Sequence, residues 1–190
     1  WGIEWLGIIS FLSLSEKVMK LGYRISRAAL LLIPAILIFT SHISLEGASI
    51  VFGVGVLTGA FATMLYLFFH FDEKVNTKIM MEGLADAFFG VVLFTYPTPD
   101  NQFFLIIFSA WIFYMGTLQL VTGLSSMEGT DYFWLYILAG ITFLAMGFVI
   151  MNYNPTFKKS IPSLVAIILV LYSGTNLYLL LKRKKDIYVS

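Results

Sequence analysis

The chain contains no cysteine among its 190 residues, which excludes a secreted fold stapled by disulfides. Charged residues are also scarce, at 12%, whereas soluble domains carry about a quarter. The net charge of +1 creates no field that would attract nucleic acid or an acidic substrate. Hydrophobic residues make up 59% of the chain, too many for a disordered protein. This composition predicts a membrane protein.

Long stretches without a formal charge predict transmembrane helices. Eighteen such residues lie between Arg27 and Glu46, and further runs cover 47–71, 101–127, 132–157 and 160–181. Each run can cross about 30 Å of hydrocarbon as a helix, and none has the alternation of an outer-membrane strand. The segment 79–97 is equally apolar but carries Glu82 and Asp86. We interpret it as a sixth span rather than a re-entrant piece, because the spans are then evenly spaced.

These spans predict an all-α polytopic membrane protein with a domain of six transmembrane helices over 24–181. Residues 1–22 are apolar but too short to span before Glu16 and Lys17, so we expect an amphipathic interfacial helix there. They lack the basic start and the small-residue cleavage site of a secretory signal. Residues 182–190 form a basic tail. Ten basic residues flank the spans on the side of both termini and only Lys158 and Lys159 on the other, which predicts cytoplasmic termini in a bacterial inner membrane.

An internal repeat is visible in the spacing of the glycines. The pairs Gly59 and Gly116, Gly83 and Gly140, and Gly90 and Gly147 are each 57 residues apart, and Gly174 follows Gly116 by 58. We therefore predict three helical hairpins, over about 24–71, 79–124 and 131–181. The first copy is degenerate, with Ser26, Ile33 and Thr40 at the positions of the two glycines and the proline. Each unit holds two spans, so successive copies enter the membrane from the same side and are related by an axis along the membrane normal. Carriers that alternate between two conformations are usually built from inverted repeats, so this arrangement makes such a carrier less expected.

The repeated motif is a glycine, a second glycine seven residues later, a proline in a short loop, and an aromatic-rich span with a further glycine. It reads Gly83, Gly90, Pro97, Trp111 and Gly116 in the second copy, and Gly140, Gly147, Pro155 and Gly174 in the third. Over about 24–181 the chain resembles the HdeD family of bacterial inner-membrane proteins. The resemblance implies a stress-related role, because HdeD is associated with acid resistance, but it implies no particular chemistry.

The small residues predict where helices pack closely, since backbones approach each other in lipid through glycine and alanine. Gly55 and Gly59 form a GxxxG pair with Ala60 beside it. Two interpretations stay open for this pair: packing inside one chain, or a homo-oligomer formed through the second span. The glycines expected to pack helices are Gly55, Gly59, Gly83, Gly90, Gly116, Gly140, Gly147 and Gly174.

Polar residues inside the spans suggest a site. Lys78, Glu82 and Asp86 follow one another at helical spacing and share a face, and a charge at that depth costs about 2.5 to 3.5 kcal/mol. The functional hypothesis is that Asp86, assisted by Glu82, binds a proton or a cation in a cytoplasm-facing pocket, with Gln119 and Asn176 as neutral ligands. The structural alternative is that Lys78 or Arg27 neutralises Glu82, while a hydrogen bond from Gln119 to Asp86 locks helices together.

No cofactor, metal or enzymatic site is predicted. His42 and His70 fall on opposite sides of the membrane, and the chain has no phosphate-binding loop, HExxH motif or nucleophile with a base. Tyr132, Trp134 and Tyr136 are typical of an interfacial aromatic belt. We therefore expect a non-enzymatic membrane protein of HdeD type that acts in stress response or as an assembly component, with lipid and a membrane protein as partners and no nucleic acid. A small proton, cation or solute transporter is the alternative, and an intramembrane enzyme is third.

Overall fold

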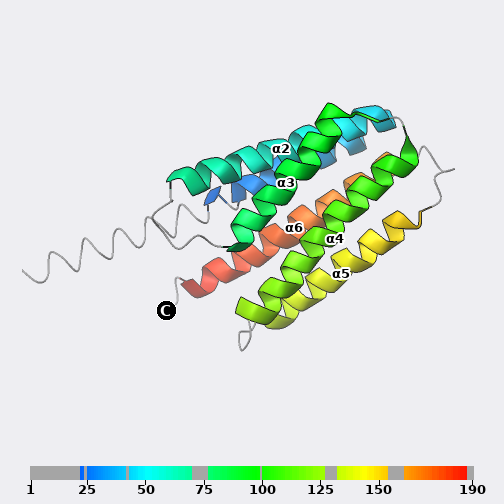
Figure 1. The fold of residues 1–190 in the computed structure, drawn as a ribbon. Coiled ribbons are helices and arrows are strands. Elements are labelled where there is room, and N and C mark those ends of the chain that lie inside the picture. The colour runs from blue at the N-terminus through cyan, green and yellow to red at the C-terminus, as the bar shows by residue number, and fades with distance from the viewer. Residues whose placement is uncertain are drawn as a thin grey trace, which may run out of the picture.

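The computed structural model describes residues 22–23, 25–41, 43–69, 77–98, 100–126, 132–153 and 161–187 (Figure 1). Nearly all of this part is helical, and it contains no strand. The helices are Ile25–Thr40, α2 (Leu45–Phe69), α3 (Thr77–Thr95), α4 (Asn101–Ser126), α5 (Phe133–Met151) and α6 (Ile161–Ile187). Nearly all of the predicted interfacial segment 1–22 lies outside the described residues, as do His42 and His70. The predicted tail over 182–190 begins as a continuation of α6.

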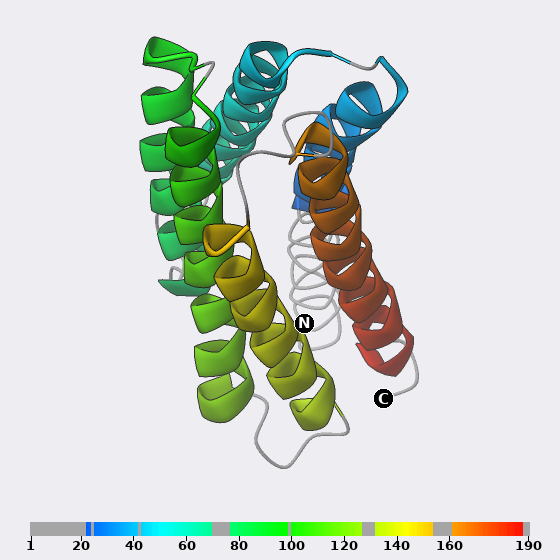
Figure 2. The same cartoon turned by 90° about the vertical axis from the view of Figure 1, so that its right-hand side faces the viewer.

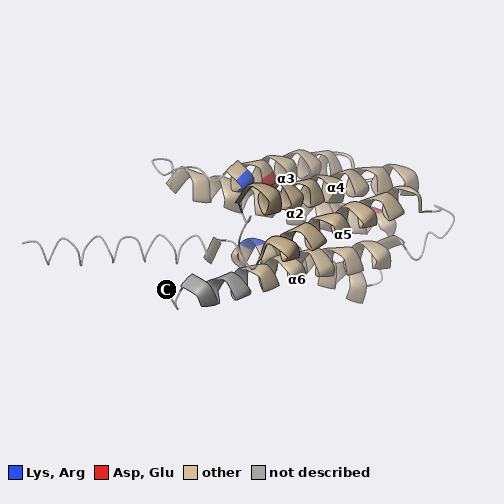
Figure 3. Ribbon diagram, turned by 90° about the horizontal axis from the view of Figure 1, so that it is seen from below, with Lys and Arg blue, Asp and Glu red and all other residues tan. Residues whose placement is uncertain are grey.

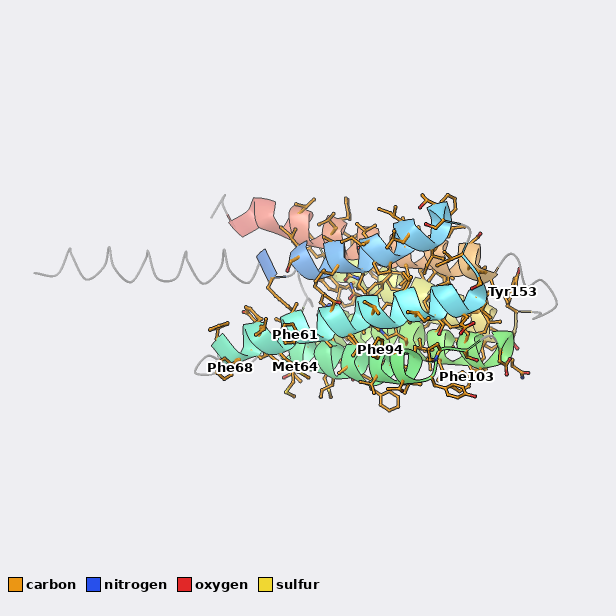
Figure 4. The ribbon with its side chains drawn as sticks, turned by 90° about the horizontal axis from the view of Figure 1, so that it is seen from above. Phe61, Met64, Phe68, Phe94, Phe103 and Tyr153 are labelled. Carbon is orange, nitrogen blue, oxygen red and sulfur yellow. The ribbon has the colours of Figure 1, made fainter. Side chains whose placement is uncertain are left out.

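Four of these helices are long and apolar enough to cross a membrane: Leu45–Phe69, Gln102–Ser125, Phe133–Met151 and Ile161–Leu179. Helix Ile25–Thr40 is shorter, and α3 carries three charged residues. The outer faces of the helices are apolar, as Phe61, Met64 and Phe68 on α2 illustrate (Figure 4). The side chain of Phe68 is 76% exposed. A soluble monomer rarely exposes so much contiguous apolar surface. The chain is a membrane protein, and these side chains suit contact with lipid.

Hydroxyl groups on these outer faces are satisfied by their own helices. Thr58, Thr117 and Thr142 each donate a hydrogen bond to the carbonyl oxygen four residues earlier. An unpaired hydroxyl in hydrocarbon would cost several kcal/mol, so this local bonding lets polar residues face lipid. At the start of α4, the Asp100 carboxylate accepts hydrogen bonds from the backbone N–H groups of Gln102 and Phe103 and caps the helix.

The helices pack in pairs that differ from the predicted hairpins. The most extensive contacts join α4 to α5 and α2 to α3, whereas α6 makes few contacts with either α5 or α2 (Figure 2). A third association joins helix Ile25–Thr40 to α6, because the Ser173 hydroxyl donates a hydrogen bond to the carbonyl oxygen of Ala28. In both extensive pairs, α2 with α3 and α4 with α5, the second helix of one predicted copy therefore packs against the first helix of the next copy. The hairpin boundaries at 24–71, 79–124 and 131–181 stay a prediction.

Glycines create the close approach between α2 and α3. A Cβ atom at Gly83 would lie 2.5 Å from Cγ2 of Thr63, and one at Gly90 would lie 3.0 Å from Cγ2 of Val56. On the other side of the contact, a Cβ atom at Gly59 would lie 3.5 Å from Oδ2 of Asp86. At Gly83 and Gly90 the two helices thus approach so closely that a side chain would clash, whereas at Gly59 a Cβ atom would make an ordinary contact.

The contact between α4 and α5 repeats this pattern 57 residues later. A Cβ atom at Gly140 would lie 2.5 Å from Cγ of Leu120, and one at Gly147 would lie 2.9 Å from Cδ2 of Phe113. Gly116 packs against Phe143, which stands at the position equivalent to Asp86. Each contact matches one between α2 and α3 when both residue numbers are shifted by 57. The sequence period therefore corresponds to a repeated helix-to-helix contact.

The GxxxG pair of α2 packs within the chain. Gly55 lies against the ring of Pro34 on helix Ile25–Thr40, and Gly59 faces Asp86 on α3. Both glycines are buried, as is Ala60. These contacts correspond to the first of the two interpretations. A homo-oligomer through α2 stays a prediction and would have to use the exposed face of the helix.

Aromatic side chains fill the middle and the Thr95 end of the bundle. The Trp111 ring on α4 lies 5.2 Å from Phe52 and 5.1 Å from Tyr172 between ring centroids, and Phe143 packs on the same tyrosine at 5.1 Å. Phe108 stacks on Trp111 at 6.0 Å. All five rings are almost completely shielded from solvent. These rings form a buried core beside Asp86.

We expect Gly140→Ala to destabilise the protein and Gly174→Ala to be tolerated. The new methyl group at Gly140 would lie 2.9 Å from the backbone nitrogen of Leu120, whereas nothing lies within 4 Å of the equivalent position at Gly174. Overpacking of this kind costs about 1 to 3 kcal/mol. Thermal unfolding in detergent should show a lower Tm for Gly140→Ala alone. Equal Tm values for the two variants would contradict the close contact of α4 and α5.

Candidate functional site

Four charged side chains meet near the end of the bundle at which α3 begins. Figure 3 shows how sparse charged positions are along the described helices. Arg27 on helix Ile25–Thr40 is paired with two carboxylates of α3: its Nη1 lies 3.0 Å from Oε2 of Glu82 and its Nη2 lies 2.6 Å from Oδ2 of Asp86. Lys78 Nζ lies 3.6 Å from Oε1 of Glu82. We call Arg27, Lys78, Glu82 and Asp86 the charge cluster; its formal charges sum to zero.

Asp86 has the most enclosed carboxylate of the charge cluster, with no exposed surface. Its Oδ2 accepts hydrogen bonds from Nε and Nη2 of Arg27, at 3.1 and 2.6 Å. Its Oδ1 accepts a third from the indole Nε1 of Trp111, at 3.0 Å. Both donors of Arg27 reach the same oxygen, and hydrogen bonds between charged groups are stronger than neutral ones. Asp86 is thus held by one cation and one neutral donor.

Lys78 connects the charge cluster to α4 and α5. Its Nζ donates a hydrogen bond to Oε1 of Gln119 at 2.9 Å and lies 5.3 Å from the centre of the Tyr136 ring. Gln119 is only 2% exposed. Its Nε2 has no hydrogen-bond partner among the described residues. The amide therefore uses its acceptor and leaves a donor unpaired in a buried setting, which is costly unless something accepts from it.

A cavity of about 40 Å³ lies beside the charge cluster. Its wall comes from helix Ile25–Thr40, α3, α5 and α6, and the space is enough for about three water molecules. Arg27, Lys78 and Glu82 line it, whereas Asp86 does not. The remaining polar residues of its wall are Tyr23, Tyr136, Tyr172, Ser173 and Asn176.

The structure brings the four predicted site residues to one end of the bundle but not into one ligand shell. Glu82 and Asn176 line the cavity, Asp86 lies outside its wall, and Gln119 contacts Lys78. Asn176 donates a hydrogen bond to the carbonyl oxygen of Tyr172, in its own helix. Proton or cation binding by these residues stays a prediction, and both acidic side chains already have protein partners.

Arg27 pairs with Glu82, as the structural alternative expects. The hydrogen bond from Gln119 to Asp86 that the same alternative predicted is replaced by other contacts. Gln119 accepts a hydrogen bond from Lys78, and Trp111 supplies the neutral donor to Asp86. Its place in the sequence puts Arg27 among the basic residues that flank the spans, but in the structure Arg27 is buried, with 6% exposure. Two buried carboxylates on α3 need a cation to balance them, which accounts for the position of Arg27 inside the bundle.

The predicted aromatic belt at the start of α5 is only partly correct. Trp134 is 69% exposed, whereas Tyr136 is buried, lines the cavity and lies under Lys78. Two residues that are two apart on a helix point about 200° from each other, so they cannot both face lipid. The sequence did contain this signal, in the helical spacing of the three aromatic residues.

Comparison with known proteins identifies part of this fold. Residues 81–152 match a family described as a short repeat of unknown function (DUF308), which is the domain in HdeD-like proteins. The matched segment runs from within α3 to the end of α5 and contains Glu82, Asp86, Trp111 and Gln119. No curated protein and no solved structure matches the chain. The chain is therefore a membrane protein, and its residues 81–152 are similar to a DUF308 repeat.

We expect Arg27→Met to destabilise the protein by roughly 3 to 5 kcal/mol, because it leaves two carboxylates buried without their cation. The triple variant Arg27→Met, Glu82→Gln, Asp86→Asn should recover much of that loss, since no uncompensated carboxylate is left. Arg27→Lys is the matched control: it keeps the charge, loses the fork and should fall in between. Unfolding in detergent measures all three. A triple variant no more stable than Arg27→Met would show that the ion pairs are not the cause.

Proposed function

We propose that this protein is a non-enzymatic integral membrane protein of HdeD type, a helical bundle that serves as a structural or assembly component of the bacterial inner membrane under stress. In this proposal the charge cluster stabilises the bundle and does not carry ions. The main support is the hydrogen-bonding of Asp86, which accepts from Arg27 and Trp111 and has no exposed surface.

The distribution of polar and apolar residues also supports a structural role. The charge cluster is formally neutral, and the rings of Phe52, Phe108 and Trp111 pack against one another beside it. An ion crossing the bundle would have to displace these rings from a close-packed core, where gaps larger than a water molecule are rare. The exposed faces are apolar, as a protein that associates with lipid requires.

The second candidate is a small proton, cation or solute transporter. It is favoured by the cavity of about 40 Å³, whose wall includes Glu82 and Asn176. A charged or polar cavity at membrane depth is a usual mark of a transport pathway. The aromatic core weighs against it, because the cavity would have to become continuous with the opposite end of the bundle.

Proton flux separates the two candidates. In proteoliposomes with an internal pH-sensitive dye and an imposed pH gradient, we expect the wild type to relax the gradient no faster than protein-free vesicles. Asp86→Asn should leave this rate unchanged while lowering the Tm, because it loses the charge that pairs with Arg27. Flux above the protein-free rate that Asp86→Asn abolishes would establish the transporter instead. The same vesicles loaded with sodium or potassium test cations.

The proposed topology has six crossings with both termini in the cytoplasm, and the absence of cysteine makes it testable by single substitutions. We expect Ser44→Cys and Asn152→Cys to react with a membrane-impermeant maleimide added to intact spheroplasts. Thr77→Cys and Ser125→Cys should react only after the membrane is opened. All four positions are at or near helix ends. Labelling of Thr77→Cys and Ser125→Cys from opposite sides of the membrane would contradict α3 as a span.

A further inference from the structure

Two polar pairs join neighbouring helices at the end of the bundle where the charge cluster lies. The hydroxyl groups of Tyr23, just before helix Ile25–Thr40, and Thr63, on α2, are hydrogen-bonded at 2.5 Å. Lys78 on α3 donates a hydrogen bond to Gln119 on α4 at 2.9 Å. The partners are 40 residues apart in the first pair and 41 in the second. The second pair follows the first by 55 and 56 residues, close to the period of the glycines, so the two pairs occupy equivalent places in the repeat.

A third pair at the same spacing is not closed. Tyr136 on α5 and Asn176 on α6 are 40 residues apart, follow Lys78 and Gln119 by 58 and 57 residues, and both line the cavity. Among the described residues the buried Tyr136 hydroxyl has no hydrogen-bond partner, and Asn176 uses only its Nδ2, in the bond to its own helix. The side chain of Asn176 is also one methylene group shorter than that of Gln119. The cavity thus lies where the third pair leaves a hydroxyl group and an amide oxygen unused.

The other polar side chains of the cavity wall already have partners in the protein. The hydroxyl groups of Tyr23 and Ser173 are hydrogen-bonded to α2 and to the first described helix. Tyr172 is hydrogen-bonded to Arg27. The three charged side chains of the wall are paired through the charge cluster. The hydroxyl group and the amide oxygen of the third pair are therefore the groups that a ligand would meet.

The charges of the wall favour an uncharged ligand. A cation in the cavity would approach Arg27 and Lys78, whereas an anion would approach Glu82. The ligand must donate a hydrogen bond to Oδ1 of Asn176 and exchange a second one with the Tyr136 hydroxyl. A hydroxyl group can do both, because it has one donor and two acceptor lone pairs.

We propose that the cavity binds one uncharged hydroxyl group, which bridges the Tyr136 hydroxyl and the amide oxygen of Asn176 and so completes the third pair. A volume of about 40 Å³ admits such a group but not the body of a larger molecule. The hydroxyl group can belong to water or to the glycerol of an uncharged lipid. A lipid would reach the cavity between α5 and α6, which make few contacts with each other.

A double-mutant cycle tests the bridge. Tyr136→Phe, Asn176→Leu and the double variant are compared with the wild type by thermal unfolding in a non-ionic detergent. Either single change removes the same bridge, so the double variant should lower the Tm by less than the two single decreases added together. The bond from Asn176 to Tyr172 is lost in both backgrounds and cancels. Additive decreases would overturn the proposal, and Asn176→Ala replaces Asn176→Leu if the latter does not fold.

A map of the wild type that resolves ordered water tests the same bridge directly. It should show density within hydrogen-bond distance of both Tyr136 and Asn176. A direct bond between the two side chains, or no density between them, would overturn the proposal even if the cycle is non-additive.

A lipid titration identifies the source of the hydroxyl group. The probe is 1-monooleoylglycerol, and methyl oleate, which has the same acyl chain without a hydroxyl group, is the matched control. A saturable rise in Tm above the control, abolished by Tyr136→Phe, identifies the lipid. Non-additive Tm values and bridging density without such a rise identify water.

Discussion

The pairing of Arg27 with Glu82 and Asp86 is the interaction on which the rest of the bundle depends. It joins the first described helix to α3 across 55 and 59 residues of sequence. Burial removes most of the hydration of these charges, and the loss of one partner would leave the others uncompensated, so we expect the three side chains to be buried together. The pairing therefore fixes where helix Ile25–Thr40 sits, and it lets α3, with its three charged residues, lie among apolar neighbours. Further along, Pro34 packs against Gly55, so the same helix also contacts α2.

The charge cluster occurs once, although the helix contact around it occurs twice. Phe143 and Ala139 stand where Asp86 and Glu82 would recur 57 residues later, and Phe143 packs on Tyr172 without an ion pair. The glycine contacts alone therefore suffice to hold α4 against α5. By the same reasoning, the carboxylates of α3 are not needed for its contact with α2. What they add is specificity for a third helix, which glycines packed pairwise cannot supply.

Much of this arrangement could be predicted from the sequence. Hydropathy identified the four long apolar helices, and the 57-residue spacing of Gly83 and Gly140 reflects contacts that repeat with the same shift. Helical spacing placed Glu82 and Asp86 on one face. The partner of that face could not be read in the same way, because periodicity fixes directions within one helix and not the rotation of another helix against it. Arg27 and Trp111 are brought to Asp86 by tertiary packing, so neither spacing nor composition singles them out.

Trp111 links the charge cluster to the aromatic core. Its indole nitrogen donates to Asp86, while its ring contacts Phe52, Phe108 and Tyr172. Any rotation that opened the core beside Trp111 would also remove a hydrogen bond from a buried carboxylate, at a cost of about 1.5 to 3 kcal/mol. Opening the core and loosening the ion pairs are thus energetically coupled. The ion pairs and the aromatic core therefore stabilise each other through this one side chain.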